Sequence, residues 1–313
     1  MEKKYINLPG TLLLLGLSAF LFLPHLCRAE DSDTENIYVE NEWDFVDQSM
    51  DISEGIPEDA AGRLLAIKNS GKLTVATEPY FAPQEFIDPD LSGQESYVGA
   101  DMELARLIAE KMDVELEIVP LSFTRVLSSV ADGEYDLAIS ALAYTPGRTS
   151  SLELSKGYYY TQNEETDGLL IRTEDTSLIQ DLDSLKERNL VAQSGSLQES
   201  LASDNIFSYR QFRRVSSIQE VYRLLENGEA DAAVVNIENA QGYIRNNPDC
   251  GLTLVPGIRF SMEEAFRGDR IAAKKGEIQL ICFVNGVIDE VLESGQYEEW
   301  LEIYTGRADE LGL

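Results

Sequence analysis

The chain has 313 residues, with 56 acidic and 25 basic side chains that give a formal net charge of −31 at pH 7. A negative charge of this size disfavours binding to nucleic acid and to anionic membrane surfaces. The one histidine, His25, lies in a segment that we expect to be removed. Its loss excludes Ser-His-Asp catalysis, Cys-His catalysis and histidine-based zinc sites, and we expect neither a metal nor a cofactor.

Residues 1–29 have the pattern of a secretory signal peptide. A positively charged start is followed by an apolar stretch from Leu12 to Leu23 and by a small residue at Ala29. We therefore expect export to the periplasm or the extracellular space. An uncleaved anchor and a lipid on Cys27 are the alternatives, and Leu26 directly before the cysteine disfavours the lipid.

The acidic segment at residues 30–66 has few regularly spaced apolar residues, and we expect a flexible leader, in which Trp43, Phe45 and Val46 could dock locally. From Lys72 onward the pattern alternates between strands and helices. The expected strands are Leu73–Ala76, Val114–Ile118, Leu190–Gln193, Phe212–Val215, Leu252–Val255 and Ile271–Ala273. The expected helices are Ala60–Ser70, Asp101–Met112 with Asp101 as its cap, Asp181–Arg188, Leu197–Ser203, Ile237–Arg245, Glu277–Leu292 and Gln296–Tyr304. This alternation predicts α/β lobes with largely parallel sheets.

Two cysteines, Cys250 and Cys282, remain in the expected exported chain. An export compartment permits a disulfide between them, but they lie on separate elements. The sequence leaves their pairing open.

One pattern occurs twice, 95 residues apart. Arg125–Ile139 has the sequence RVLSSVADGEYDLAI, and Glu220–Val234 has the sequence EVYRLLENGEADAAV. Each copy predicts a helix, a glycine that ends it and a buried strand, so the chain should form two similar lobes. Because ligands bind beyond the carboxyl ends of such strands, the segments 140–143 and 235–236 are expected to face each other across a cleft.

Two positively polarised features lie near these strand ends. Gly195 and Ser196 stand between an expected strand and a helix, where Ser196 and Glu199 form a capping box. The free amides at such a helix start can bind an anion. Arg148 follows the first strand end, and its guanidinium fits a carboxylate through two parallel hydrogen bonds. Plain helix capping and an ordinary surface arginine are the alternatives.

A family resemblance joins these features. The segments GKLTVATEPYFAPQEF, YVGADMELARLIAEKM, GEYDLAISALAYTPGR, VAQSGSLQESLA and ADAAVVN occur in the order found in the extracytoplasmic amino-acid-binding proteins of ABC transporters, family 3. The resemblance covers Gly71–Gly306. It implies a two-lobed periplasmic-binding-protein-like fold, each lobe a mostly parallel sheet flanked by helices, with two hinge crossings near Tyr160–Asn163 and Arg267–Arg270. Lobe 1 would comprise residues 67–161 and 270–313, and lobe 2 residues 162–269.

The resemblance also implies a function and a ligand-binding site. The protein would be a monomer that captures a small carboxylate-bearing solute, most simply an amino acid, and delivers it to an ABC transporter permease. Arg148, with Ser196 and Gly195, corresponds to the clamp on the ligand α-carboxylate. Phe81 corresponds to an aromatic residue that packs on the ligand, Glu78 to a residue that contacts its side chain, and Ser140 to the pocket wall.

Three positions depart from the family pattern. Ala141 and Ala143 replace small hydroxyl residues, so only backbone contacts remain there. Asn236 stands where the family has an aspartate that pairs with the ligand α-ammonium, and an amide adds no charge. We expect Glu78 or Glu238 to supply the missing charge, with Glu78 favoured.

Two other functions stay open. The protein could be the ligand-sensing subunit of a separate membrane receptor, and neighbouring genes would discriminate this role from transport. It could also be a dehydratase-like enzyme on the same fold, with Glu78 or Glu238 as a general acid of raised pKa. The binding function is favoured because nothing in the sequence establishes such an acid.

Overall fold

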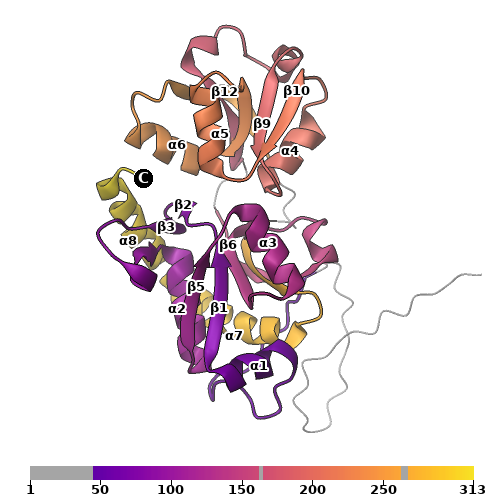
Figure 1. Ribbon diagram of the computed structural model, residues 1–313, viewed down its shortest axis with the longest axis vertical. Helices are drawn as coiled ribbons and strands as arrows, with labels where there is room; N and C mark the ends of the chain where they lie inside the picture. The colour runs from indigo at the N-terminus through magenta and orange to yellow at the C-terminus, as the bar shows by residue number, and fades with distance from the viewer. Residues whose placement is uncertain (1–44, 162–164, 262–266) are drawn as a thin grey trace, which may run out of the picture.

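A computed structural model describes residues 45–161, 165–261 and 267–313. The expected signal peptide, Cys27 and residues 30–44 of the leader lie outside this part of the chain. The chain forms two α/β lobes, as Figure 1 shows. Each lobe is built on a five-stranded sheet. No helix in the described ranges is long and apolar enough to cross a membrane.

Lobe 1 contains the sheet β5-β1-β6-β13-β7, in which only β13 runs against the other strands. Its strands are β1 (Lys72–Thr77), β5 (Glu115–Pro120), β6 (Leu137–Ala143), β7 (Leu152–Tyr159) and β13 (Asp269–Lys274). The helices are α1 (Gly62–Ser70), α2 (Ala100–Met112), α3 (Phe123–Asp132), α7 (Ile278–Ser294) and α8 (Gln296–Leu311). A small sheet of β2 (Tyr80–Phe81), β3 (Glu85–Ile87) and β4 (Tyr97–Val98) completes the lobe.

Lobe 2 contains the sheet β10-β9-β11-β8-β12, in which only β8 runs against the others. Its strands are β8 (Asp167–Arg172), β9 (Asn189–Gln193), β10 (Gln211–Val215), β11 (Ala232–Asn236) and β12 (Leu252–Phe260). The helices are α4 (Leu197–Asn205), α5 (Ile218–Glu226) and α6 (Ile237–Asn246). The helix expected at Asp181–Arg188 is only a short 3₁₀ turn at Leu182–Leu185.

Side chains of the central strands alternate between two apolar layers. In lobe 1, Leu137 and Ile139 pack into the larger core with α1, α2 and α7, while Ala138 faces the layer under α3. Lobe 2 repeats this with Val234 on one face of β11 and Val235 on the other. A strand buried on both faces needs this continuous apolar composition.

The repeated sequence forms the same structure in both lobes, as predicted. α3 and α5 end near Gly133 and Gly228, which have positive φ angles of 80° and 69°. The strands that follow, β6 and β11, occupy the middle of their sheets. Two sets of equivalent strand ends therefore point toward the space between the lobes.

The aspartates shared by the two copies make the same bond. Asp136 Oδ2 accepts the backbone N–H of Thr74 at 2.6 Å, and Asp231 Oδ2 accepts that of Asn189 at 2.7 Å. Each aspartate thus fixes the strand beside its own. The identity of these residues has a structural cause in both lobes.

The chain passes between the two sheets twice. β7 of lobe 1 leads into β8 of lobe 2, and β12 of lobe 2 leads back into β13 of lobe 1. Asp269, which we expected in lobe 2, pairs with Ala143 and Tyr159 in the lobe 1 sheet. Residues 162–164 and 262–266 of the two connections lie outside the described ranges.

The expectation of a flexible leader is wrong for residues 45–66. Val46, Ile52 and Ile56 are buried in the lobe 1 core. Asn285 of α7 donates from Nδ2 to the carbonyl oxygens of Val46 and Gln48, at 2.8 and 2.9 Å. Residues 45–61 are held by tertiary contacts without a helical or strand period, and the sequence indicated only that Phe45 and Val46 could dock locally. Residues 62–66 belong to α1, where a helix was expected.

α7 is shaped to receive this segment. A Cβ added at Gly286 would collide with the carbonyl oxygen of Met50. Glycine here permits a close backbone approach.

Cys250 carries a free thiol and is therefore not bridged to Cys282, which is buried in α7.

Candidate functional site

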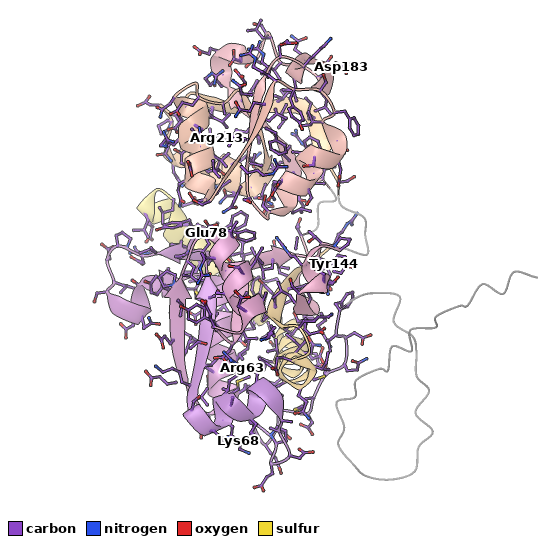
Figure 2. All side chains as sticks on the ribbon, turned by 45° about the vertical axis from the view of Figure 1, so that its right-hand side comes forward. Arg63, Lys68, Glu78, Tyr144, Asp183 and Arg213 are labelled. Atoms are coloured by element: carbon purple, nitrogen blue, oxygen red, sulfur yellow. The ribbon has the colours of Figure 1, made fainter. Side chains whose placement is uncertain are left out.

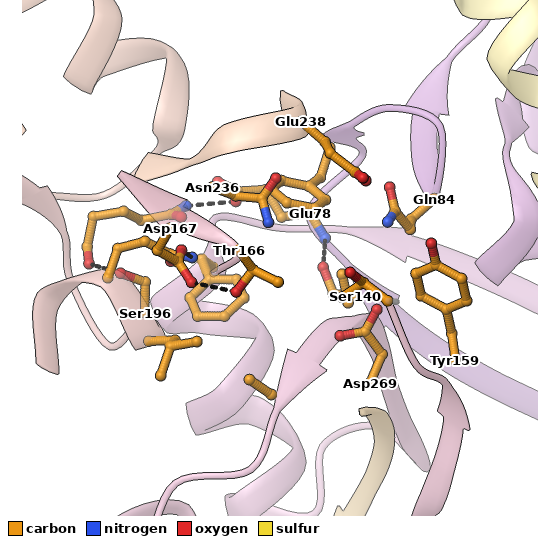
Figure 3. A pocket seen from close by; sticks show the side chains of 18 of the residues that line it. Glu78, Gln84, Ser140, Tyr159, Thr166, Asp167, Ser196, Asn236, Glu238 and Asp269 are labelled. Atoms are coloured by element: carbon orange, nitrogen blue, oxygen red, sulfur yellow. Dashed lines mark hydrogen bonds between the residues drawn. The ribbon is translucent and has the colours of Figure 1, made fainter. Parts of the chain in front are cut away.

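A pocket lies between the lobes, where the carboxyl ends of β1, β6, β9 and β11 face one another. Figure 2 shows Glu78 at the boundary between the lobes, and Figure 3 shows the pocket from close by. Every expected site residue except Gly195 lines it: Glu78, Phe81, Ser140, Ala141, Ala143, Arg148, Ser196, Asn236 and Glu238. The carbonyl of Gly195 contacts Arg148 directly.

Arg148 is buried and joins the lobes. Its guanidinium donates to the carbonyl oxygen of Ala143 and, at 2.9 Å, to that of Gly195 in lobe 2. Its buried Nε has no hydrogen-bond partner. Burial lowers the pKa of Arg148 to about 10, and the nearby Asp269 opposes this shift. A buried guanidinium bound only to carbonyl oxygens is a strong site for an anion.

The turn before α4 forms the predicted capping box. Glu199 N–H donates to Ser196 Oγ at 3.0 Å, and Gly195 N–H donates to Glu199 Oε2 at 2.7 Å. The Ser196 hydroxyl donates to the Gln193 carbonyl oxygen at 2.8 Å. The amides of Leu197 and Gln198, in the first turn of α4, have no acceptor within the helix and lie where the pocket begins.

Glu78 forms the second contact between the lobes. It is buried, and its Oε2 accepts a hydrogen bond from Gln193 Nε2 at 2.5 Å. The other oxygen, Oε1, is buried without a partner. Burial raises the pKa of Glu78 to about 7, although the bond from Gln193 opposes the shift. The pocket thus holds a carboxyl group that accepts further donors.

Ser140 connects Glu78 to a deeper carboxyl group that we did not expect in the site. Its hydroxyl donates to Glu85 Oε1 at 2.9 Å and accepts the N–H of Glu78 at 3.0 Å. Glu85 Oε2 is buried without a partner. Burial, and then the negative charge of Asp101, raise the pKa of Glu85 well above its usual range.

Asp101 lies behind the pocket wall formed by Ser140 and Ala141 and is hydrogen-bonded to it. Contrary to our expectation, it does not cap α2, whose cap position is Gly99. Its carboxylate accepts the hydroxyls of Tyr297 at 2.6 Å and Tyr158 at 3.0 Å, and the N–H of Ala141 at 2.9 Å. Ala141 has a φ of 45°, in the left-handed region that costs a residue with a side chain about 1 kcal/mol or more. Asp101 therefore holds the strand end in its unusual conformation.

Asp269 is another pocket carboxyl group that the sequence did not single out. It begins β13 beside the second crossing and lines the pocket with Tyr159. Burial raises the pKa of Asp269 to about 8, and Asp101 adds to the shift while Arg148 and Arg270 oppose it. No local pattern marks this residue, because only the fold brings this strand start to the pocket.

The lobe 2 wall carries Asn236, Glu238 and an unexpected carboxylate, Asp167. Asn236 Oδ1 accepts the N–H of Asn239 at 3.0 Å, so this side chain caps α6. Glu238 is exposed, whereas Asp167 is almost completely buried, with 1% of its surface accessible. Burial raises the pKa of Asp167.

Apolar surface separates these charged groups. Phe81 lies on the short β2 strand, and Phe123 packs both in the lobe 1 core and against Arg148, whose Cζ is 5.5 Å from its ring centre. Ala141 and Ala143 leave the strand end open to the pocket. The pocket can enclose a small solute between aromatic surface and charged ends.

The pocket holds more negative than positive groups. Two basic residues line it, the buried Arg148 and the half-buried Arg267, while the acidic residues lining it are Glu78, Glu85, Asp167, Glu238 and Asp269. Glu78, Glu85 and Asp167 are buried and Asp269 is half-buried, and burying their ionised forms without cations is costly. The arrangement is therefore complementary to a ligand with one carboxylate and more than one positive charge.

Residues 73–307 match the model of the bacterial extracellular solute-binding proteins, family 3. This match covers most of the chain, and the chain belongs to that family. The family assignment agrees with the two-lobed fold and the pocket between the lobes.

Relatives and solved structures agree with this assignment. The chain is 29% identical to the arginine-binding extracellular protein ArtP of Bacillus subtilis over 233 residues, which cover 73% of this chain and 84% of ArtP. It is 25% identical to a probable histidine-binding protein of Campylobacter jejuni, covering 74% and 84% of the two chains. The crystal structure of AbpA from Streptococcus pneumoniae bound to L-arginine superposes with a TM-score of 0.68 at 32% identity, covering 78% of this chain and 98% of AbpA.

Proposed function

We propose that this solute-binding protein captures an α-amino acid with a cationic side chain outside the cytoplasm and delivers it to an ABC importer. The observation that carries the proposal is the charge distribution of the pocket. One buried guanidinium, Arg148, faces a set of buried carboxyl groups. Glu78 accepts a side-chain hydrogen bond from the neutral Gln193, and Glu85 accepts one from the neutral Ser140. A neutral or acidic amino acid would leave most of these carboxyl groups uncompensated.

Arg148 is the group suited to the ligand α-carboxylate. Its Nε is unpartnered, and its bond to the Gly195 carbonyl can be exchanged for charge-assisted bonds to a carboxylate. The first-turn amides of α4 add positively polarised donors from lobe 2. Both lobes would then hold the same end of the ligand.

Glu78, Glu85 and Asp269 are suited to a cationic side chain. Glu78 and Glu85 each carry a buried oxygen with no hydrogen-bond partner, and both are linked through Ser140. A guanidinium has five donors in a planar fork and can satisfy several such oxygens at once. Phe81 offers an aromatic surface against which a guanidinium stacks.

The names of the relatives support the same ligand class. ArtP is described as arginine-binding and AbpA was solved with L-arginine. The Campylobacter relative is described as a probable histidine-binding protein. All three names point to an amino acid whose side chain can carry positive charge.

A binding screen tests the ligand class. L-arginine, L-lysine, L-ornithine and L-histidine are compared with L-glutamine, L-glutamate and L-leucine by thermal shift, followed by calorimetry. A ligand at 100 times its Kd should stabilise the protein by about 2.7 kcal/mol. We expect this for at least one cationic amino acid, and preferential binding of L-glutamate or L-leucine would contradict the proposal.

Ligand exchange requires the lobes to separate. The Glu78–Gln193 and Arg148–Gly195 bonds span the two lobes and close over the pocket. We place the hinges in the two crossings near residues 160–163 and 267–270. Small-angle scattering should show a smaller radius of gyration with ligand than without it, unless the free protein is already closed.

One observation favours a second function. Glu78 has a pKa raised to about 7 inside a closed pocket, which suits a general acid for dehydration. Incubation with prephenate or arogenate, followed by detection of an aromatic product, tests this role. We favour binding because the group's unpartnered oxygen and its acidic neighbours also fit a bound cation.

A further inference from the structure

We propose that Asp167 binds the α-ammonium of the ligand, a role that the family resemblance would place on residue 236 and that we expected Glu78 or Glu238 to fill. This inference rests on the proposed function, since it requires an amino acid ligand. It assigns to β8 a ligand-binding residue that specifies the amine.

The position of Asp167 is fixed by strand pairing. β8 and β11 are antiparallel, and Asp167 is the direct register partner of Asn236. Directly opposed residues project from the same face of a sheet with Cβ atoms about 5 Å apart. Both residues line the pocket, and Figure 3 shows them on the same wall. A carboxylate at 167 therefore reaches nearly the same space as one at 236.

Asn236 itself is poorly suited to hold an ammonium. Its Oδ1 is engaged with the N–H of Asn239 as the cap of α6. The other polar group of an asparagine side chain is an NH₂ donor, which cannot accept a hydrogen bond from an ammonium. The second lone pair of Oδ1 is uncharged, so the negative charge that an ammonium requires must come from a neighbouring residue.

Asp167 is held beside the carboxylate-binding end of the pocket. Gln198 of α4, two residues after Ser196, donates from Nε2 to Asp167 Oδ1 at 2.8 Å. Thr166 Oγ1 donates to Asp167 Oδ2 at 2.7 Å. In an α-amino acid the ammonium is one carbon away from the carboxylate, so its acceptor must lie near the clamp.

The carboxylate has capacity left for the ligand. The hydrogen bonds from Thr166 and Gln198 come from neutral groups, and each carboxylate oxygen can accept a second one. No lysine or arginine of the described chain forms an ion pair with it. An ammonium would neutralise a buried charge that the protein leaves uncompensated.

The other carboxyl groups are placed for a different part of the ligand. Glu78 and Glu85 belong to the lobe 1 wall around Ser140. Glu238 is exposed, so its field is screened by solvent. Asp167 is the buried carboxylate that belongs to the same wall as the helix start of α4.

The test moves the charge between the paired strands. Asp167→Asn, Asn236→Asp and the double variant are compared by calorimetry with L-arginine and with 5-guanidinopentanoate, which is arginine without its α-amine. Asp167→Asn should weaken L-arginine binding by about 10- to 100-fold, the range for a hydrogen bond to a charged group. It should change binding of 5-guanidinopentanoate far less. The double variant should recover most of the affinity for L-arginine.

Controls keep the outcomes distinct. Asp183→Asn, an exposed aspartate at the far end of lobe 2 in Figure 2, should leave both affinities unchanged. Equal losses for both ligands, or no loss for L-arginine, would overturn the role of Asp167. If the wild type prefers a neutral amino acid, the same comparison with that amino acid and its deaminated analogue still tests Asp167. Failure to bind any amino acid would overturn both proposals.

Discussion

Asp167 lies directly opposite Asn236 in the antiparallel pair of β8 and β11, and both line the pocket between the lobes. An aspartate at 236 could cap α6 with one oxygen and bind a cation with the other. Asn236 keeps the cap but lacks the charge. The structure thus places the cap on one strand and the carboxylate on its neighbour.

Arg148→Ala should weaken ligand binding strongly. Removing one partner of a desolvated charge pair costs about 2–5 kcal/mol, which corresponds to a loss of roughly 30-fold or more. Calorimetry on the folded variant measures the change. Arg125→Ala is the matched control, because this arginine lies on α3 and pairs with Glu134 at the surface. An unchanged affinity in Arg148→Ala would remove this residue from the site.

Glu78→Gln should reduce the affinity for L-arginine more than the affinity for L-glutamine. The glutamine keeps the shape of the side chain and loses the charge that faces the ligand cation, so we expect about a 10-fold loss or more. Glu238→Gln, at an exposed position, should have a small effect. Equal affinities in wild type and Glu78→Gln would show that this carboxyl group does not contact the cation.

Short sequence patterns are sufficient to predict much of this site. Two strand ends, the Arg148 position and the Ser196 capping box all follow from local patterns, and each lies where the pattern placed it. Asp167 and Asp269 have no such local pattern. They reach the pocket only because β8 pairs with β11 and β13 pairs with β6, and register between distant strands is not encoded in a short window of sequence.

The same limit applies to residues 45–61. Their apolar residues are too widely spaced for a helix or a strand period, and acidic residues lie between them. Val46 and Ile52 are nevertheless buried. Asn285 of α7 donates a hydrogen bond to the backbone of this segment, and Gly286 of α7 has no side chain that would block its close approach. Composition describes the average environment of a segment and does not detect such individual contacts.

Asp136→Ala and Asp231→Ala should each lower the free energy of unfolding by about 1–3 kcal/mol, because each leaves a buried strand N–H without its acceptor. The matched controls are Glu134→Ala and Glu229→Ala, which the two copies also share. Those glutamates form half-exposed ion pairs, so their replacement should lower the free energy of unfolding by less than about 1 kcal/mol. Chemical denaturation measures all four variants, and equal losses in both sets would contradict the assignment.

The ligand-free protein should lose stability as the pH rises. Glu78 has a pKa raised by burial from 4.5 to about 7, and Asp269 from 3.8 to about 8. When the pH lies between the ordinary pKa and the raised pKa of such a group, the folded protein retains a proton that the unfolded chain releases. The contribution of these groups to the free energy of unfolding therefore falls with increasing pH. Glu78→Gln removes one of the pocket carboxyl groups with a raised pKa, which also include Glu85 and Asp167, and should flatten the pH dependence of Tm.

Binding of a cationic amino acid should show the opposite pH dependence. The ligand cation favours the ionised carboxyl groups, so its binding releases protons and its affinity should rise between about pH 6 and pH 8. Calorimetry in phosphate and in Tris at the same pH measures this release directly, because the two buffers take up protons with different heats. Identical heats in the two buffers would contradict the release of protons from Glu78 and Asp269 on binding. Asp183→Asn, a change at an exposed position, should leave the buffer difference intact, whereas Glu78→Gln should reduce it, because one of the titrating groups has been removed.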